Sequence, residues 1–452
     1  MATHTDHAVV VGGSLGGLLA ARVLSESFKQ VTIVDRDVMT TDPVPRKGVP
    51  QGRHAHALLA RGREAFEELF PGLTDELVAL GVSKMDFQSE FRWYNDGLLL
   101  CQQPSGMIGL GASRPLLEAR IRARVLALTN VTVMDGSEAT DLVAAPGAPR
   151  ITGVHVTRLG EQQSHQVLSA DLVVDATGRG TRGPNWLEAL GYPAPTTDRV
   201  EVGLAYGSRL YRRDPNGPQP AAVAMSVAHP RGGAMLAQEG DRWIVTYSGL
   251  LGDATPLDHE GFTEFAATLP SMAIHDVIRD AEPLSDPLRF RYPASTRRRW
   301  EILPYVPEGF LAFGDAIASF SPVYGQGMSV SAVQALGLRE CLQQGVDQLA
   351  PRFFKKAAAI VDIPWSIGVD GDLRFPGVQG KRTARVRLTN AYLARLHVAA
   401  EHDPAVAYAF LRVINLLDAP PRLLLPSTAL RVLRGNIDRR SHIARPQVAT
   451  TA

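Results

Sequence analysis

The chain has 452 residues, enough for two or three domains with a large hydrophobic core. Its composition is that of a globular protein, with 45% hydrophobic and 21% charged residues, and its net charge of +1 argues against nucleic acid or an anionic membrane as the main partner. Two cysteines without a CxxC motif, and the lack of an 18-residue apolar run, predict a cytoplasmic protein without disulfides, thiolate metal sites or membrane spans.

The first predicted element is a buried strand over residues 7–11, which leaves no room before it for a signal peptide. The glycine-rich stretch VVVGGSLGG follows, and then a predicted helix over residues 15–27. A second strand ends at Asp35, eighteen residues after Gly17. This order matches the dinucleotide fingerprint G-x-G-x-x-G, with Ser14 in the place of the middle glycine.

These residue types suit a nucleotide, although a strand–helix–strand unit without a ligand is the alternative. Gly12 allows a tight turn, Gly17 allows close packing of the helix, and the helix N-terminus can hold a pyrophosphate. Asp35 can accept hydrogen bonds from both ribose hydroxyls of an adenosine. The predicted contacts of this end are Gly12, Gly13, Ser14, Leu15, Gly16, Gly17, Asp35 and Arg36.

A basic loop, RKGVPQGRHAH, follows the second strand. Its basic residues are Arg46, Lys47, Arg53, His54 and His56. The loop either folds back over the cofactor with its cations near the diphosphate or flavin, or lies on the surface as an ordinary basic loop. As cofactor contacts, Arg46 and Arg53 are preferred to the histidines. The next helix is predicted to start at Ser113-Arg114-Pro115, with proline in its first turn.

Two later segments have the same strand-then-turn character. In DATGRG, a strand over residues 172–175 ends at Asp175 and turns through Gly178. In GDAIASFSPVYGQGM, a buried strand stops at Gly314-Asp315, and a loop leads through Gly325 to a helix at Gly327-Met328. Three such loops spread over the chain suit one long, bent nucleotide. FAD has an adenosine end, a ribityl chain that can bond a carboxylate, and a flavin edge that suits backbone donors at a helix N-terminus.

Residues 195–300 alternate in the manner of an antiparallel sheet, with a hairpin predicted at Glu239-Gly240. The larger side chains on its strands include Tyr206, Met225, Trp243 and Tyr247. These either line an apolar pocket or form the core. The last part of the chain is predicted to be mostly helical, with a turn-rich loop over residues 362–378 that is either a lid or a connector.

The last hundred residues are basic. Residues 351–452 contain 16 Lys and Arg against 7 Asp and Glu. Solvated helical faces with extended arginine side chains are the preferred explanation. The alternative is an electropositive flank for an acidic partner, such as a carrier protein or a nicotinamide phosphate.

The motifs GGSLGG, DATGRGTR and GDAIASFSPVYGQGM, in this order, resemble those of the class A flavin-dependent monooxygenases. The resemblance implies the α/β aromatic-hydroxylase fold, with a Rossmann-like FAD-binding domain of the GR2 type. The implied domains are residues 1–194 and 301–345 for FAD binding, 195–300 for an inserted antiparallel substrate domain, and 346–452 for a helical region.

The resemblance also implies roles for particular residues. Asp315 would bind the ribityl chain, the backbone at Gly327 and Met328 would donate to the flavin pyrimidine ring, and Pro322 would line the cavity before the flavin. Arg114 is either a cofactor contact or part of a plain helix cap. The other implied cofactor contacts are Asp175, Gly178, Gly314 and Gly325. The family has an Asp-Gly pair where this chain reads DATG, so the docking of the reductant stays open.

Three further segments, RKGVPQGRHAHALL, ASRPLLEARIR and PNWLEALGYPAP, resemble the actinobacterial flavin epoxidases of polyether biosynthesis. This resemblance implies alkene epoxidation of an apolar polyene or polyketide, free or carrier-bound, in antibiotic biosynthesis. A flavin hydroperoxide would supply the oxygen, dioxygen would be the co-substrate, and NAD(P)H or a separate flavin reductase would supply electrons. The flavin carries this chemistry, so no catalytic side chain and no metal ligand is predicted.

Other functions remain open. Hydroxylation of an aromatic substrate is the first alternative. A flavin halogenase would carry W-x-W-x-I-P, of which this chain has only Trp243, with Val245 in the place of the second tryptophan. A prenyl-type reductase would saturate a double bond without oxygen, and a non-enzymatic FAD-binding protein is the remaining possibility.

Overall fold

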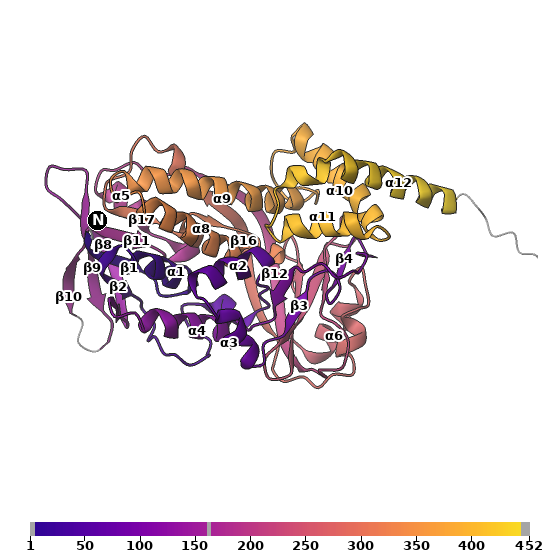
Figure 1. Ribbon diagram of the computed structural model, residues 1–452. Coiled ribbons are helices and arrows are strands. Elements are labelled where there is room, and N and C mark those ends of the chain that lie inside the picture. Colours follow the sequence, from indigo (N-terminus) through magenta and orange to yellow (C-terminus); the bar gives the residue numbers. More distant parts are fainter. Residues whose placement is uncertain (1–4, 161–163, 444–452) are drawn as a thin grey trace, which may run out of the picture. The chain divides into compact units, whose positions relative to one another are not determined.

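The computed structural model describes residues 5–160 and 164–443 (Figure 1). The chain divides into two compact units, each built from three separate segments. The first unit consists of Met1–Ser83, Leu110–Val202 and Tyr292–Gly368. The second consists of Lys84–Gly109, Gly203–Arg291 and Val369–Ala452.

A five-stranded parallel sheet forms the centre of the first unit, in the order β17-β11-β1-β2-β7. Its strands are β1 (Thr5–Val11), β2 (Phe28–Val34), β7 (Val131–Met134), β11 (Leu172–Asp175) and β17 (Phe310–Ala312). All residues of β11 and β17 are buried, as expected for parallel strands covered on both faces. The predicted α/β fold with a Rossmann-like core is therefore confirmed.

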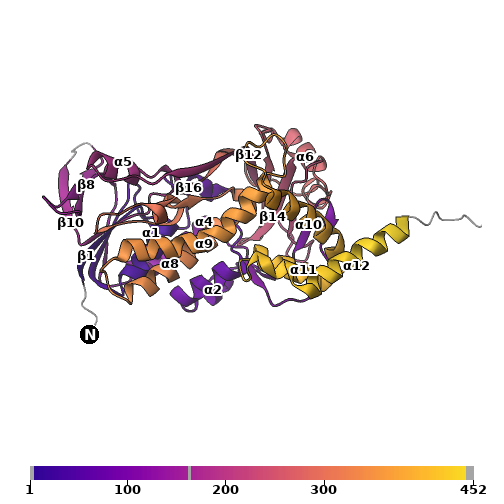
Figure 2. The ribbon, with the colours of Figure 1, turned by 90° about the horizontal axis from the view of Figure 1, so that it is seen from above.

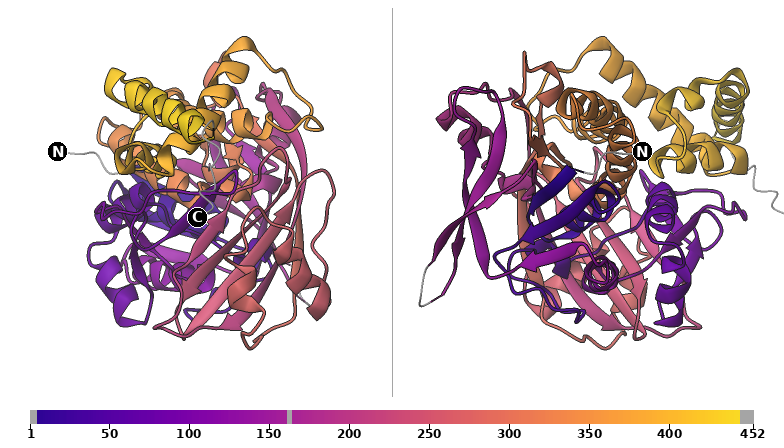
Figure 3. Two further views of the ribbon diagram at one scale, coloured as in Figure 1. Left: turned by 90° about the vertical axis from the view of Figure 1, so that its right-hand side faces the viewer. Right: turned by 60° about the vertical axis from the view of Figure 1, so that its left-hand side comes forward.

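The rest of the first unit consists mainly of helices and a second sheet. The helices are α1 (Leu15–Leu24), α2 (Ala60–Leu69), α3 (Leu73–Ala79), α4 (Arg114–Leu126), α5 (Gly183–Ala189), α8 (Gly327–Leu342) and most of α9 (Leu349–Asp372). Helices α1 and α8 lie side by side. A three-stranded antiparallel sheet, β8 (Ser137–Ala144), β9 (Ile151–Arg158) and β10 (His165–Ser169), lies away from α8 and α9 (Figure 3).

The prediction of a loop over residues 362–378 is wrong for residues 362–372, because α9 continues to Asp372 with Pro364 inside it. Proline removes one backbone donor, which disfavours a helix. Tertiary contacts offset that cost on both sides of the proline. Arg297 donates to Asp362 at 2.6 Å, and Trp365 packs edge-on against Phe320 with ring centroids 6.5 Å apart.

The second unit is built on an antiparallel sheet. The full sheet has the order β18-β16-β12-β15-β14-β13-β4-β5, and the chain passes from one unit to the other within β12 and β16. Its strands are β4 (Arg92–Asn95), β5 (Leu98–Leu99), β12 (Thr197–Arg212), β13 (Ala221–Val223), β14 (Arg231–Gln238), β15 (Arg242–Gly249), β16 (Leu288–Arg298) and β18 (Ala318–Ser319). The predicted hairpin at Glu239-Gly240 is confirmed, since Gln238 pairs with Arg242.

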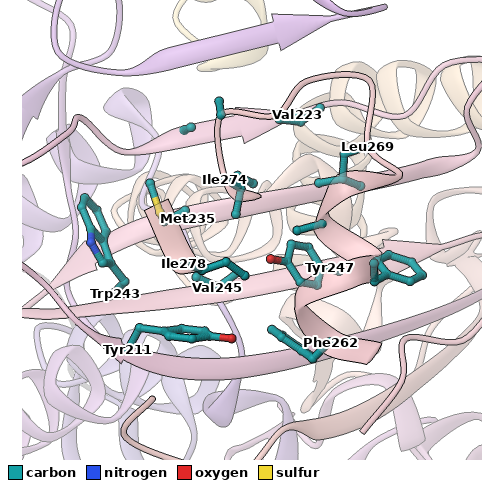
Figure 4. Packing of buried hydrophobic residues seen from close by; sticks show 14 of the residues in the cluster. Tyr211, Val223, Met235, Trp243, Val245, Tyr247, Phe262, Leu269, Ile274 and Ile278 are labelled. Carbon is teal, nitrogen blue, oxygen red and sulfur yellow. The ribbon is translucent and has the colours of Figure 1, made fainter. Parts of the chain in front are cut away.

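One face of this sheet packs against α6 (His259–Ala267) and α7 (His275–Ile278). Figure 4 shows Trp243, Val245 and Tyr247 projecting together among the side chains of this core. The rings of Tyr247 and Phe262 are 4.7 Å apart. Of the two alternatives for Trp243 and Tyr247, the structure therefore supports the core, and these two residues do not line a pocket. The alternation gave their common face correctly, but α6 and α7 cover that face.

The remaining helices of the second unit are α10 (Ala384–Ala400), α11 (Pro404–Ile414) and α12 (Pro426–Ile443). They lie side by side (Figure 2). A new helix begins after α10 because Asp403 caps α11 and Pro404 occupies its first turn. Within the described residues, no helix combines the length and hydropathy that crossing a membrane requires.

Candidate functional site

The turn between β1 and α1 requires two of its glycines. Gly12 has φ of +102°, and a Cβ there would lie 2.7 Å from the carbonyl oxygen of Ala176. A Cβ on Gly17 would overlap the carbonyl oxygen of Gly12. The first motif is therefore packed directly on the second, since Ala176 follows β11. Leu15 is buried at the start of α1.

Asp35 directly follows β2, beside this turn, and is buried. Its Oδ2 accepts the backbone N–H of Gly13 at 2.5 Å and forms an ion pair with Arg46 at 3.5 Å. Its Oδ1 accepts the N–H of Asp37 at 2.8 Å. A carboxylate has about four acceptor positions, so capacity remains for a ribose hydroxyl. Arg36 is exposed to solvent.

The three predicted loops converge. A Cβ on Gly314, which has φ of +65°, would lie 4.0 Å from the Cα of Gly16. A Cβ on Gly178, with φ of +79°, would lie 3.9 Å from the Cβ of Asp315. The loops follow β1, β11 and β17, which are neighbours in the sheet. Ligands of open α/β sheets bind outside the carboxyl ends of such strands.

The place where these three loops meet is called the junction below. Asp315 is partly accessible at the junction, yet protein surrounds it. Burial raises the pKa of its carboxyl group, although Arg114, Arg179 and Arg298 oppose that rise. Among the residues that the structure describes, none donates a hydrogen bond to this carboxylate. Arg298, which sequence reasoning missed, donates to the carbonyl oxygens of Ala316 at 3.3 Å and Arg179 at 3.1 Å. The Asp315 carboxylate is therefore a hydrogen-bond acceptor to which none of the described residues donates.

The N-terminus of α8 is the second polar element at the junction. Gly325, with φ of +64°, turns the chain into the helix, which begins at Gly327. A Cβ on Gly327 would meet open space, so there is room beside the first turn of the helix, whose first backbone N–H groups have no partner within the helix. Met328 is buried. The side-chain Oε1 of Gln326 is buried and, within the described part of the chain, has no hydrogen-bond partner.

Glu118 on α4 organises the first loop and was missed from the sequence. It is 3% exposed, and its Oε2 accepts from Ser14 Oγ at 3.0 Å and Arg114 Nε at 3.2 Å. Its Oε1 faces Arg122 NH2 at 3.1 Å and Arg46 Nε at 3.4 Å. Burial alone would raise the pKa of Glu118, but the three arginines hold it below its ordinary value. The i, i+4 spacing of Arg114, Glu118 and Arg122 was the available sequence pattern.

Arg46 brings unused donors to this cluster. Its side chain is 7% exposed. Its Nε and NH1 atoms are buried and make no hydrogen bond with the described residues, and Nε has only the ion pairs with Glu118 at 3.4 Å and Asp37 at 3.8 Å. The buried NH1 group, which has no acceptor among the described residues, suits the oxygens of a diphosphate, which bind arginine with strong charge-assisted hydrogen bonds.

The other residues of the basic loop lie either near the cluster of Glu118 and its arginines or on the surface. Arg53 ends the 3-10 turn Pro50–Arg53 and is exposed. His56 instead lies near Arg114: burial, together with that positive charge, lowers its pKa to about 3. His56 Nδ1 lies 2.9 Å from the carbonyl oxygen of His54, so it donates there. The neutral ring keeps Nε2 as an acceptor.

Asp175 acts within its own turn. It is fully buried and accepts from Thr177 N at 3.0 Å, from Thr177 Oγ1 at 2.6 Å and from the hydroxyl of Thr181. Its carboxylate therefore fixes the backbone that presents Gly178 to Asp315. Its role in the structure is to position that turn.

The residues predicted on the substrate side belong to different elements of the chain. Pro322 is exposed at the start of a 3-10 turn before α8. Tyr206 packs on Phe290, with ring centroids 5.4 Å apart, on the sheet face opposite Tyr247. Met225 covers Gly232 on that same face, where a Cβ on the glycine would lie 2.8 Å from Met225 Cγ.

Similar solved structures define the class of fold. PqsL, a probable FAD-dependent monooxygenase from Pseudomonas aeruginosa, matches with a TM-score of 0.61 and 16% identity, over 83% of this chain and 99% of that one. The flavin-dependent brominase Bmp2 matches with a TM-score of 0.66 and 14% identity, over 98% and 100%. A flavoprotein/dehydrogenase from Cytophaga hutchinsonii matches with 0.64 and 16%, over 97% and 100%. The chain has the aromatic-hydroxylase fold of FAD-dependent monooxygenases and flavin halogenases.

Sequence comparison gives the family. No protein-family model matches the chain. The chain is 34% identical to Protein Rv3254 of Mycobacterium tuberculosis over 435 residues, which cover 92% of this chain and 90% of that protein. The chain belongs to the same family as this mycobacterial protein.

Proposed function

We propose that the protein is an FAD-dependent monooxygenase. The observation that carries the proposal is the convergence of three loops, from β1, β11 and β17, on the Asp315 carboxylate. A single mononucleotide needs one such loop, whereas a long dinucleotide needs several. The NH1 group of Arg46, which has no acceptor among the described residues, and the first turn of α8, with open space beside Gly327, add two further polar elements at the same end of the sheet.

The residues present fit FAD along its length. Asp35 would accept the adenosine ribose, and Arg46 with the start of α1 would hold the diphosphate. Asp315 would accept the ribityl hydroxyls, and the first N–H groups of α8 would donate to the flavin pyrimidine ring. When bound and reduced, the flavin activates dioxygen and supplies one oxygen atom for transfer.

The reaction that we propose is epoxidation of an alkene in an apolar, polyene-like natural product. One oxygen atom of O2 enters the carbon–carbon double bond and the other leaves as water. NAD(P)H gives up a hydride, which carries the two electrons, and becomes NAD(P)+, either directly or through a separate flavin reductase. The hydride hydrogen and one proton from solvent leave in the water. The support is the resemblance of the loop at Arg46 and the helix start at Arg114 to flavin epoxidases of polyether biosynthesis.

Halogenation is the rival that the similar brominase suggests. It is disfavoured because Trp243 stands without a second tryptophan, and Val245 is fully buried in the core beneath α6 and α7. Hydroxylation of an aromatic ring and saturation of a prenyl double bond remain as outcomes of the test.

The proposed reaction is tested by turnover with labelled oxygen. The flavin-loaded protein receives NAD(P)H, 18O2, chloride and bromide, together with polyene, aromatic and terpenoid candidates. We expect a polyene product heavier by one labelled oxygen atom, detected by mass spectrometry. A halogenated product, or a saturated product formed equally well without oxygen, would contradict monooxygenation. A labelled phenol would replace epoxidation by hydroxylation.

Asp315→Ala is expected to weaken flavin binding and, at the same time, to make the flavin-free protein more stable. A hydrogen bond to a charged group is worth about 1.5–3 kcal/mol. Flavin affinity should therefore fall about 10- to 150-fold, measured by fluorescence titration of the flavin-free protein. Burial raises the pKa of Asp315 in the folded state above its value in the unfolded state. Ionisation of this carboxyl group therefore opposes folding, and stability is lost as pH rises through the folded-state pKa. The flavin-free variant should therefore be more stable than the parent at pH 7.

The control for this substitution is Asp6→Ala. Asp6 is an exposed aspartate of the same unit and is paired with Lys29 on the surface. It should change neither quantity measurably. If the Asp315→Ala protein binds FAD as tightly as the parent, Asp315 does not contact the cofactor.

A further inference from the structure

Five strands of the second unit carry a continuous cross-strand row. Trp93 of β4 pairs with Ala222, Ala222 with Ala234, Ala234 with Thr246, and Thr246 with Ser208 of β12. Directly opposed residues project from the same face of a sheet. These residues, which we call the Trp93–Ser208 row, therefore share one face. The α6 and α7 core lies on the other face, from which Met235 and Val245 project (Figure 4).

The row stays accessible in the middle of the sheet. Trp93, Ala222, Ala234 and Thr246 are each partly exposed. Their chain neighbours on the other face, Val223, Met235 and Val245, are at most 2% exposed. Adjacent positions along each of these strands thus differ in burial. Two of the four accessible side chains are alanines, so no large side chain of the row itself stands between its two ends.

The two ends of the row differ in chemistry. Trp93 offers a flat apolar surface at one end. At the other end, the hydroxyls of Ser208 and Thr246 lie 2.5 Å apart and form a polar pair. Neighbouring strands are about 4.8 Å apart, so the row from β4 to β12 is about 19 Å long. That length suits an extended chain rather than a compact ring.

Asn95 gives an independent indication of a ligand beside Trp93. Both residues project from the same face, since they are two positions apart on β4. The Trp93 indole N–H can only donate, and it donates to Asn95 Oδ1 at 3.3 Å. The amide Nδ2 is therefore turned away. It is buried, on a residue only 5% exposed, and lacks a hydrogen-bond partner among the described residues.

An acceptor from a ligand would satisfy this amide. Leaving a buried donor without a partner is costly, whereas a carbonyl or hydroxyl oxygen on a bound molecule would restore the missing bond. The row thus combines an apolar middle with a donor at the Trp93 end and hydroxyls at the Ser208 end.

We propose that the Trp93–Ser208 row binds the substrate of the proposed monooxygenase as an extended apolar chain that carries oxygen functions. Asn95 donates to a carbonyl or hydroxyl oxygen at one end, and the hydroxyl of Thr246 contacts a polar group at the other. This inference rests on the proposed function for the identity of the ligand as substrate. A plain hydrocarbon would leave the Asn95 amide without a partner, so the row distinguishes oxygenated polyenes from hydrocarbons.

The probes are an all-trans tetraene fatty acid of 18 carbons and the hydrocarbon diphenylhexatriene, both fluorescent when bound. Ala234→Phe places a ring across the middle of the row and should weaken binding of the tetraene acid at least about 10-fold. The matched control is Ala267→Phe, which adds the same ring at an exposed position of α6, on the other side of the sheet. It should bind the acid as the parent does. Equal affinity of Ala234→Phe and the parent would overturn the proposal.

A second pair of variants tests the polar ends. Asn95→Leu and Thr246→Val should each weaken binding of the acid about 2- to 10-fold and leave diphenylhexatriene unchanged. Equal losses for both probes would show damage to the fold and contradict the assigned roles. Flavin content, read from absorbance, should match the parent in every variant. Failure of the labelled-oxygen test with intact, row-dependent binding would reject the enzyme activity and keep the ligand site.

Discussion

Gly17→Ala is expected to destabilise the flavin-free protein strongly or to prevent folding. The added Cβ would overlap the carbonyl oxygen of Gly12, a backbone atom that no rotamer change can move. Overpacking that side chains can absorb costs about 1–3 kcal/mol, and a backbone overlap should reach at least the upper end of that range. We therefore expect the thermal midpoint to fall by at least about 6 °C, measured by circular dichroism.

The neighbouring glycine supplies the control. A Cβ on Gly16 would have Phe313 as its nearest contact, at an ordinary 3.9 Å. Gly16 also lies inside α1, where alanine is favoured over glycine by about 0.5–1 kcal/mol. The thermal midpoint of Gly16→Ala should therefore equal or exceed that of the parent. Equal losses in the two variants would mean that the close approach at Gly17 does not determine the turn.

The parts of the site that the sequence predicted correctly are those set by local geometry. A strand, a tight turn and a helix within a few residues leave little choice about where Gly12 and Gly17 must lie. The same holds for Asp35, because a residue that directly follows β2 reaches the same sheet edge as the turn after β1. Short-range spacing alone was enough for these residues.

Residues whose role depends on distant packing were harder to place. The alternation on β15 gave Trp243 and Tyr247 a common face, but α6 and α7 decide which face becomes core. Ala222 and Ala234 carry no sequence pattern of their own. Their accessibility emerges only once the strand register is known.

The basic loop illustrates the same limit. Arg46 and Arg53 are equivalent cations by composition, yet Arg46 is buried against Asp35 and Glu118, whereas Arg53 ends an exposed turn. The partner that distinguishes them, Glu118, comes from a helix much later in the chain. Spacing within α4 indicated pairing among Arg114, Glu118 and Arg122, but could not bring Arg46 to them.

Glu118→Gln is expected to cost about 3–5 kcal/mol of unfolding free energy in the flavin-free protein at pH 7, because it leaves buried arginines without their shared counter-charge. The side chains of Arg46, Arg114 and Arg122 are only 7%, 9% and 2% exposed, so water cannot replace the lost carboxylate. Glutamine keeps the shape and one acceptor oxygen, so the loss measures charge rather than a cavity. Urea denaturation gives the difference directly.

The pH dependence of that difference provides the stricter test. The folded-state pKa of Glu118 lies below its ordinary value, so its contribution is complete above the unfolded-state pKa and is lost as pH falls through the folded-state value. The gap between parent and Glu118→Gln should therefore narrow in acid. The control is Glu76→Gln, which removes a glutamate that bonds Arg120 and Arg124 near the surface, where such pairs contribute about 0–1 kcal/mol. A loss for Glu118→Gln no larger than for Glu76→Gln, or a gap that stays constant with pH, would contradict a buried, charge-stabilised cluster at the start of α1.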